Sequence, residues 1–282
     1  MKILFFCPRW GQSHVSWDDF ACKAKGAGYD GIETDIPTDP AERRLLLDAV
    51  NKYGLLFIAQ HWETLAPDYD AHKKEYTERI AQLAAVKPLF INSQTGKDYY
   101  SFEQNEQLIK LAAATATETG VAVYHETHRG KFSFAAHITH EYLRRINRLK
   151  LTLDVSHWCA VAETLLHDQE EAVQMAISRT RHVHARVGYA QGPQVSDPRA
   201  PEWQQALDFH LRCWDAVVDT HRKLQRSILT FTMEFGPFPY MPQHPYTQQP
   251  LSDQWDINLH MKNLLKQRYE SIILQPEQNM YP

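Results

Sequence analysis

Four acidic or imidazole side chains lie near the ends of four apolar segments of the chain. They are Glu126 in VAVYHE, Asp154 in LTLDVSH, His184 in RHVHAR and Glu234 in LTFTMEF. Two glutamates, an aspartate and a histidine that converge from neighbouring parallel strands would form a divalent-metal site at the mouth of a barrel. This set of residue types therefore predicts a metal-dependent enzyme.

The residues around these four groups alternate in type, as they do in strands with two different faces. In the first segment Val121 and Val123 fall on the face opposite Glu126. The other three segments divide in the same way, with the ligand type opposite the apolar face. A parallel barrel requires this division, because one face of each strand packs under the outer helices and the other points toward the barrel axis.

Short apolar runs typical of buried strands alternate with helix-like stretches along the whole chain. The expected strands cover residues 2–7, 31–34, 55–60, 88–92, 121–126, 151–155, 182–187 and 229–235. The expected helices cover residues 17–27, 40–53, 71–86, 103–119, 134–148, 203–224 and 252–274, with a broken helical region at 160–179. Strand and helix repeat at roughly 30 residues, which indicates βα units. We therefore predict an α/β fold, a single (β/α)8 TIM barrel that forms one domain over residues 1–282.

Two connections are longer than ordinary loops between a strand and a helix. Residues 188–202 and 236–251 are rich in proline and follow strands 7 and 8, which carry His184 and Glu234. Active sites of such barrels are built at the carboxyl ends of the strands, so these loops are expected either to cover the site or to form irregular surface. Three tryptophans, Trp10, Trp62 and Trp158, also follow strand ends. They are candidates either for apolar walls of a pocket or for core residues.

Composition excludes several classes of function. The net charge is −4 and the hydrophobic fraction is 43%, which describes an ordinary globular protein and argues against a nucleic-acid binder with a basic surface. No run reaches the roughly 20 apolar residues that span a bilayer, and the start of the chain has no cleavage-site pattern. The 4 cysteines form no CxxC pair. We expect a cytoplasmic protein with reduced thiols and no membrane partner.

Five short motifs resemble those of the xylose isomerase-like barrel superfamily. They are GYDGIE at 28–33, YHETHRG at 124–130, LDVSHW at 153–158, HVHAR at 182–186 and MEFGP at 233–237. They occur in the order found in the superfamily and extend over nearly the whole chain. The superfamily includes sugar phosphate isomerases and epimerases, dehydratases and the AP endonuclease family 2, to which endonuclease IV belongs.

The resemblance implies a role for eight residues. Glu126, Asp154, His184 and Glu234 would be the metal ligands, and the two glutamates would also be the catalytic acid and base. His157 and Arg186 would bind the substrate. His61 and Glu33, near the ends of strands three and two, would contact the substrate or support the groups that do.

The implied activity is that of a metal-dependent isomerase or epimerase of a small sugar or related polyhydroxy carbonyl compound. Proton transfer next to a carbonyl needs one group to remove the proton and another to return it, with a cation to stabilise the enediolate. The oxygen-rich ligand set with one imidazole favours one Mn²⁺, Mg²⁺ or Co²⁺ ion, with Zn²⁺ as an alternative. The expected partner is a sugar-like small molecule, and the sequence leaves assembly into a homo-oligomer open.

Other interpretations use the same residues. A dehydratase would eliminate a hydroxyl from a keto-polyol, an endonuclease IV-like phosphodiesterase would need several further ligands, and a non-catalytic barrel would only bind sugar. The carboxylates could instead be neutralised by Arg186 or Arg129 in an ion-pair network without metal. His182 is expected to be a packed, hydrogen-bonded histidine below the site, and His128 is placed to reach the rim.

Overall fold

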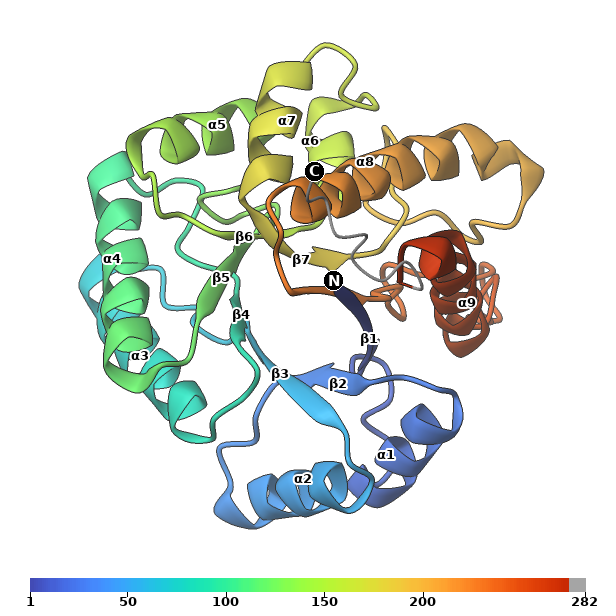
Figure 1. The fold of residues 1–282 in the computed structure, drawn as a ribbon, viewed down its shortest axis with the longest axis horizontal. Coiled ribbons are helices and arrows are strands. Elements are labelled where there is room, and N and C mark those ends of the chain that lie inside the picture. Colours follow the sequence, from blue (N-terminus) through green and yellow to red (C-terminus); the bar gives the residue numbers. More distant parts are fainter. Residues whose placement is uncertain (274–282) are drawn as a thin grey trace, which may run out of the picture.

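The strands of the computed structural model, which describes residues 1–273, close into a parallel barrel in sequence order (Figure 1). They are β1 (Lys2–Pro8), β2 (Gly31–Thr34), β3 (Leu56–His61), β4 (Ile91–Ser93), β5 (Val123–Glu126), β6 (Leu151–Leu153), β7 (Thr180–His184) and β8 (Ile228–Thr232). β1 pairs with β8 as well as with β2, which closes the ring. The predicted (β/α)8 TIM barrel is therefore confirmed.

The helices surround the strands on the outside of the ring (Figure 1). They are α1 (Trp17–Gly26), α2 (Pro40–Lys52), α3 (Tyr69–Ala85), α4 (Phe102–Thr119), α5 (Ala136–Arg145), α6 (Val155–Ala162), α7 (Glu170–Arg179), α8 (Gln204–Lys223) and α9 (Gln254–Ile273), with a short 3-10 helix η1 (Pro201–Trp203). Leu274, the last residue of the final predicted helix, lies outside the described residues. No helix among residues 1–273 is both long and apolar enough to cross a membrane.

The sixth strand is shorter than predicted, and the difference matters for the site. We expected a strand over residues 151–155, but β6 ends at Leu153 and α6 begins at Val155. The carboxylate of Asp154 accepts a hydrogen bond from the backbone N–H of Ser156, so it caps the new helix at its N-terminus. A polar residue after a short apolar run can end a strand and start a helix, and alternation alone does not reveal that turn.

Strand alternation produces two separate apolar layers. The outward residues of the strands, such as Phe5, Leu153 and Phe231, pack under the helices in one large core. The inward residues Phe6 and Ile58, together with Phe90, form a small cluster inside the lower part of the barrel. The barrel interior is thus filled below the site.

The two long connections follow β7 and β8, as predicted, and are tied to each other. Gln194 in the first connection donates from Nε2 to the carbonyl oxygen of Gly236 in the second, at 3.1 Å. The backbone N–H of Gly236 donates in return to Oε1 of Gln194, at 2.7 Å. This pair of bonds fixes the start of the loop after β8, directly beyond Glu234.

Candidate metal centre and its cavity

The four predicted ligands meet at the carboxyl-terminal mouth of the barrel. One candidate ligand atom from each of Glu126, Asp154, His184 and Glu234 lies within 4.8 Å of the others, and all four residues are buried. Glu126 and His184 are the last residues of β5 and β7, Asp154 lies between β6 and α6, and Glu234 follows β8 by two residues. Parallel strands therefore bring together residues that are up to 108 positions apart in sequence, from Glu126 to Glu234.

The imidazole of His184 is held so that one nitrogen faces the two glutamates. Its Nε2 lies 3.1 Å from Oε1 of Glu33, which is the partner expected to accept the ring N–H. Its Nδ1 lies 2.8 Å from Oε2 of Glu234 and 3.6 Å from Oε1 of Glu126. A histidine that donates one ring N–H to a carboxylate and directs the other nitrogen toward further ligand atoms has the usual arrangement of a metal ligand.

Each of the two glutamates has one oxygen held by an amide and one oxygen left for another partner. Gln60 Nε2 donates to Oε1 of Glu234 at 3.0 Å, and Gln94 Nε2 donates to Oε2 of Glu126 at 3.3 Å. Asn92 Nδ2 also donates to Oε2 of Glu126, at 3.1 Å. Oε1 of Glu126 is buried and has no hydrogen-bond partner among the described residues. This orphaned oxygen fits a cation as its partner, because buried carboxylate oxygens are otherwise hydrogen-bonded.

The alternative ion-pair network is present in part. Arg186 Nη2 contacts Oδ2 of Asp154 directly and lies 3.5 Å from Oε2 of Glu234. One guanidinium does not neutralise the cluster, however, since Glu33, Glu126, Asp154 and Glu234 are all buried around it. Four carboxylates against one guanidinium leave two negative charges when His184 is protonated, and three when it is neutral, as a metal ligand must be. Buried charge of one sign is costly, so the donor set fits a divalent cation.

The same charges shift the pKa values at the centre. Burial opposes a charge on His184, but Glu234, Glu33 and Glu126 outweigh it and raise the pKa of His184 well above its usual value. Burial also raises the pKa of Glu126, yet the charge of His184 leaves that pKa lowered to about 2. For Glu234, burial exceeds the opposing effects of His184 and Arg186, and the pKa is raised. The two glutamates thus differ in how readily they hold a proton, as acid and base partners often do.

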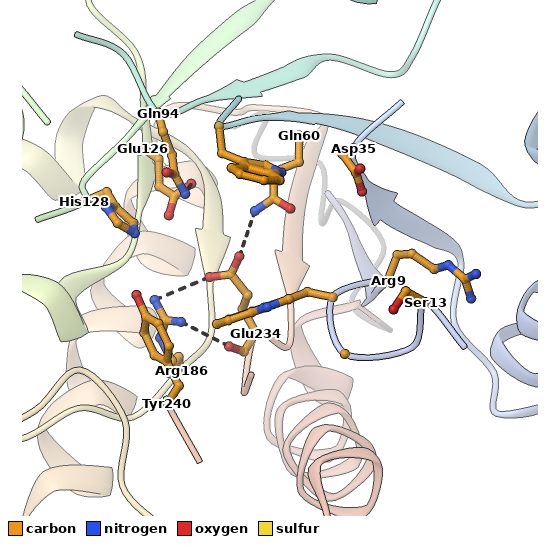
Figure 2. A pocket seen from close by; sticks show the side chains of 13 residues that line it. Arg9, Ser13, Asp35, Gln60, Gln94, Glu126, His128, Arg186, Glu234 and Tyr240 are labelled. Carbon is orange, nitrogen blue, oxygen red and sulfur yellow. Dashed lines mark hydrogen bonds and ion pairs between the residues drawn. The ribbon is translucent and has the colours of Figure 1, made fainter. Parts of the chain in front are cut away.

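A cavity of about 360 Å³ opens above the centre (Figure 2). The side chains that line it come from several loops and strand ends, and Glu126, Arg186 and Glu234 form its inner end. The others are Arg9, Trp10, Gly11, Ser13, Asp35, Gln60, Trp62, Gln94, His128 and Tyr240. Cavities of this size bind small organic molecules.

Comparison with known proteins gives a match by structure only. No family model matches the chain, and no curated protein matches it by sequence. A solved structure of a xylose isomerase-like TIM barrel protein from Mycobacterium smegmatis, in complex with magnesium, superposes with a TM-score of 0.62 at 9% identity, covering 96% of this chain and 97% of that one. The chain has the xylose isomerase-like barrel fold.

Two further solved structures share this fold over nearly their whole length. A 3-keto-D-glucoside 4-epimerase from E. coli matches with a TM-score of 0.62 and 12% identity, covering 94% of this chain and 100% of that chain. A probable 3-DHS dehydratase from Bacillus anthracis matches with a TM-score of 0.58 and 17% identity, covering 94% and 99%. At such identities the likeness shows the fold and not the reaction.

Within this xylose isomerase-like barrel, Arg186 and His157 lie beside the centre. Arg186 lines the cavity, and its Nη2 lies 2.8 Å from Nε2 of His157. Since arginine only donates hydrogen bonds, His157 accepts at Nε2 and a neutral ring carries its proton on Nδ1. Burial holds the pKa of His157 well below its usual value, so the ring is neutral. His157 Nδ1 has no hydrogen-bond partner in the described part of the chain and is a donor ready for an oxygen atom.

The structure does not bring His61 into the cavity. Its ring lies between β3 and α3, with Nδ1 3.1 Å from Ser93 Oγ and Nε2 2.7 Å from Thr64 Oγ1. Adjacent residues of a strand face opposite ways, so when Gln60 points into the cavity His61 must point toward the helices. The structure thus places His61 outside the cavity lining, and of its two expected roles, substrate contact and support, its position matches support.

Glu33 and His182 lie below the cavity and support His184. Glu33 does not line the cavity; its Oε2 is 3.0 Å from Nε2 of His182, and its Oε1 faces His184. His182 Nδ1 lies 2.7 Å from Thr230 Oγ1. Of the two alternatives expected for Glu33, substrate contact and support, its position matches support. His182 is packed and hydrogen-bonded below the site, as expected.

Sequence reasoning missed Gln60, Gln94 and Tyr240. Gln60 could have been found, because it lies two residues after Ile58 on the inward face of β3. Gln94 and Tyr240 belong to loops, where no periodicity indicates direction. Trp10, Trp62 and His128 do line the cavity, whereas Trp158 is fully buried in the core and donates to the carbonyl of Ser133 at 2.8 Å.

A second group of potential ligands, Glu126, His128 and His157, also lies within 4.8 Å. His128 Nδ1 is 2.6 Å from the carbonyl oxygen of Arg129, to which it donates. The bond from Arg186 to Nε2 of His157 places the proton of that ring on Nδ1, which therefore has no lone pair for a metal. This second group is better suited to binding substrate oxygens than to holding a second ion.

Proposed function

We propose that the protein is a metal-dependent isomerase or epimerase of a small sugar-like polyhydroxy carbonyl compound. The observation that carries the proposal is the pair Glu126 and Glu234. Both line the same cavity, each is oriented by an amide, and their remaining oxygens converge on Nδ1 of His184. Proton transfer beside a carbonyl needs two such groups within reach of one substrate.

Glu126, Asp154, His184 and Glu234 would hold the ion in this proposal. Three carboxylates and one imidazole suit Mn²⁺, Mg²⁺ or Co²⁺, with Zn²⁺ as the alternative. A bound divalent cation would supply a Lewis acid that stabilises the negative charge formed beside the substrate carbonyl. Asp154 and His184 would serve mainly as anchors, since Asp154 is tied to α6 and Arg186, and His184 to Glu33.

The remaining work falls to side chains of the cavity. One of the two glutamates would take the proton from the substrate carbon, and the other would return a proton to the same or the neighbouring carbon. His157 is fully buried beside Arg186 and does not line the cavity, and in this proposal its unpartnered Nδ1–H would bind a substrate oxygen. The solved structure with the same fold that is named a 3-keto-D-glucoside 4-epimerase supports a reaction of this kind.

The test is exchange of substrate C–H protons with solvent. Protein loaded with Mn²⁺ and placed in D2O with a panel of ketoses, aldoses and their phosphates should incorporate deuterium, as measured by NMR. Glu126→Gln and Glu234→Gln should each lower the exchange rate by roughly 10²–10⁴, the usual effect of a general acid or base. Glu118→Gln, on the exposed face of α4, is the control. Exchange that is absent, or that survives both cavity substitutions, would contradict the proposal.

A dehydratase is the second candidate, favoured by the fold match to a probable 3-DHS dehydratase. The same two glutamates would then remove the proton and assist the departure of a neighbouring hydroxyl as water. The product would be an unsaturated ketone, so a rise in ultraviolet absorbance with any keto-polyol of the panel would favour elimination over isomerisation.

A further inference from the structure

Three cationic side chains gather at the amino-terminal end of the barrel, opposite the cavity, and we call them the basic cluster. Lys150 directly precedes β6, Arg181 is the second residue of β7, and Arg226 lies two residues before β8. β7 pairs with β6 on one side and with β8 on the other, so the three residues stand at the starts of neighbouring strands. This end of a barrel usually serves stability, which repulsion between like charges opposes.

Two of these cations are held against the same atom. Nη1 of Arg181 and Nη1 of Arg226 both donate to the carbonyl oxygen of Thr180, each at 3.1 Å. The two nitrogens are therefore no further apart than twice that distance. A guanidinium group has five N–H donors, and the bond to Thr180 uses only one of those of Arg181. Most of its donors are left for another partner.

No carboxylate of the described residues balances the basic cluster. The groups whose charges act on its members are the members themselves, Arg179 and the phenol of Tyr124. In contrast, Arg79, Arg199 and Arg268 each lie 2.6 Å from a carboxylate oxygen. The cluster is thus a local excess of positive charge on a chain whose net charge is −4.

The pKa values reflect this excess. Burial and the charge of Arg181 lower the pKa of Arg226 to about 10. Burial also lowers the pKa of Lys150, and both arginines add to the effect. Neighbouring cations lower a pKa because they disfavour the charged form, and a bound anion would remove that cost.

The carboxyl-terminal end of α7 explains only one of the three cations. The last carbonyl groups of a helix attract positive charge, and Arg226 donates to the carbonyl oxygens of Ser178 and Thr180 at 3.0 and 3.1 Å. Arg181 and Lys150 remain as two further positive charges. Residues 274–282 contain a single acidic residue, Glu277, which is fewer than this surplus.

Tyr124 adds a hydroxyl group from inside the barrel. Its half-buried ring packs on Phe90, with ring centres 4.6 Å apart. Burial raises the pKa of Tyr124, and Arg181 and Arg226 are the charges that oppose this rise. The phenol therefore lies near both guanidinium groups and keeps its proton, so it can donate a hydrogen bond to an anion bound there.

We propose that Lys150, Arg181, Arg226 and Tyr124 form a second site, which binds the phosphate group of a small molecule at the amino-terminal end of the barrel. Arginine forks bind phosphate oxygens through paired hydrogen bonds, and lysine adds a point charge. A phosphate monoester carries a charge of about −1.5 to −2 at pH 7, which matches the two surplus cations, whereas a carboxylate would neutralise only one. The site is independent of the proposed function.

The experiment is a calorimetric titration at constant ionic strength without added divalent metal. The probes are inorganic phosphate and glycerol 2-phosphate, compared with acetate and a short single-stranded DNA. We expect both phosphates to bind, and acetate to bind at least about tenfold more weakly because it carries less charge. The tighter of the two phosphates identifies the source, the free ion or a phosphorylated metabolite. Absence of phosphate binding, equal binding of acetate, or DNA binding tighter than either phosphate would overturn the inference.

Substitutions locate the bound phosphate. Arg181→Gln and Arg226→Gln should each weaken its binding by at least about tenfold, the loss of a hydrogen bond to a charged group. Lys150→Gln alters an exposed side chain that folding does not require, and it should weaken binding by about threefold. Arg212→Gln, which removes the same charge from an exposed position of α8, is the control and should change affinity by less than about twofold. Unchanged affinity in Arg181→Gln and Lys150→Gln would place the phosphate elsewhere and contradict the site.

Thermal unfolding gives a second readout that a purely structural role of Arg181 would not affect. Phosphate that binds the folded protein raises its unfolding temperature. The rise should be equal in the native protein and in Arg212→Gln, and smaller at the same phosphate concentration in Arg181→Gln. An equal rise in Arg181→Gln would refute the proposed site.

Discussion

The floor of the barrel is the buried apolar cluster of Phe6, Ile58 and Phe90, and the mouth is the polar end that holds the four candidate ligands. The same strands build both regions, but their inward side chains change from apolar to polar toward the carboxyl end. On β3 the inward residues are Ile58 and then Gln60. Phe90 is followed two residues later by Asn92 on β4, and on β5 Tyr124 is followed by Glu126. In each case a step of two residues toward the carboxyl end replaces an apolar side chain by one that binds another polar group.

The inward side chains of the barrel thus fall into two groups, one that stabilises the fold and one that could bind ligands. The floor gains free energy by burying Phe6, Ile58 and Phe90 with no charge to compensate. The mouth gathers buried carboxylates that repel one another, which destabilises the fold unless a cation is bound. Barrels of this type commonly place stabilising residues at the amino-terminal end and catalytic residues at the other end.

Truncating the floor should have the largest effect on stability. Phe6 is fully buried in the cluster with Ile58 and Phe90, so Phe6→Ala should lower the free energy of unfolding by about 3–5 kcal/mol. Urea unfolding followed by circular dichroism measures the change. Metal affinity per folded molecule should stay within about threefold of the native value, because Phe6 packs in the apolar cluster with Ile58 and Phe90 below the ligands.

The control for this change is Leu65→Ala, since Leu65 is 58% exposed and should cost less than about 0.5 kcal/mol. If Phe6→Ala reduced the free energy of Mn²⁺ binding by as much as it reduced the free energy of unfolding, the mouth and the floor would act as one unit.

Three residues form a chain of contacts from the mouth toward the floor, and their substitution should weaken metal binding by progressively smaller amounts. His184 faces the glutamates, Glu33 accepts from His184, and His182 lies below Glu33. We expect His184→Ala to weaken Mn²⁺ binding by more than about 100-fold, Glu33→Gln by about 10–100-fold and His182→Ala by less than about tenfold, since the effect of a supporting group falls with each bond from the metal. Calorimetric titration of metal-stripped protein measures all three.

Circular dichroism spectra of the three variants would confirm that they are folded before titration. If His182→Ala weakened binding as much as His184→Ala, the ion would lie lower in the barrel, near Glu33, and the assigned ligand set would be wrong.

The sequence indicated the barrel and the meeting of the four ligands for the same physical reason. Alternation of apolar and polar residues fixes which face of a strand points inward, and parallel strands bring their carboxyl ends to one side. Glu126 and His184 end their strands and could be placed on that ground. Asp154 was assigned to a strand although it caps α6, because the capping bond to Ser156 leaves no mark on periodicity.

The cavity walls were less accessible to sequence reasoning. His61 was expected to contact the substrate or to support the groups that do, from its position near a strand end, and alternation on β3 turns it toward α3. Tyr240 enters from a long loop, and its direction follows from contacts with Trp10 and Arg186 that involve distant parts of the chain. Such contacts depend on packing between loops, for which local sequence has no periodic signal.

The two glutamines of the mouth, which orient the candidate catalytic glutamates, should give the smallest effects on substitution. Gln60 and Gln94 donate to Glu234 and Glu126 at 3.0 and 3.3 Å, and each thereby directs the other carboxylate oxygen toward His184. Gln60→Ala and Gln94→Ala should each lower the rate of C–H exchange by about tenfold, the equivalent of one hydrogen bond to a charged group, while changing the unfolding free energy by less than about 1 kcal/mol. NMR exchange rates in D2O and urea unfolding measure the two quantities.

Gln191→Ala, in an exposed part of the loop after β7, is the matched control and should change neither quantity. The expected split between rate and stability distinguishes orientation of the glutamates from simple packing, because a packing role would reduce stability and leave the rate per folded molecule unchanged. An unchanged rate in both variants would mean that His184 and the bound ion orient the carboxylates without help. In that case the polar layer of the mouth would owe its function to the ligands alone, and the two amides would serve only to satisfy buried oxygens.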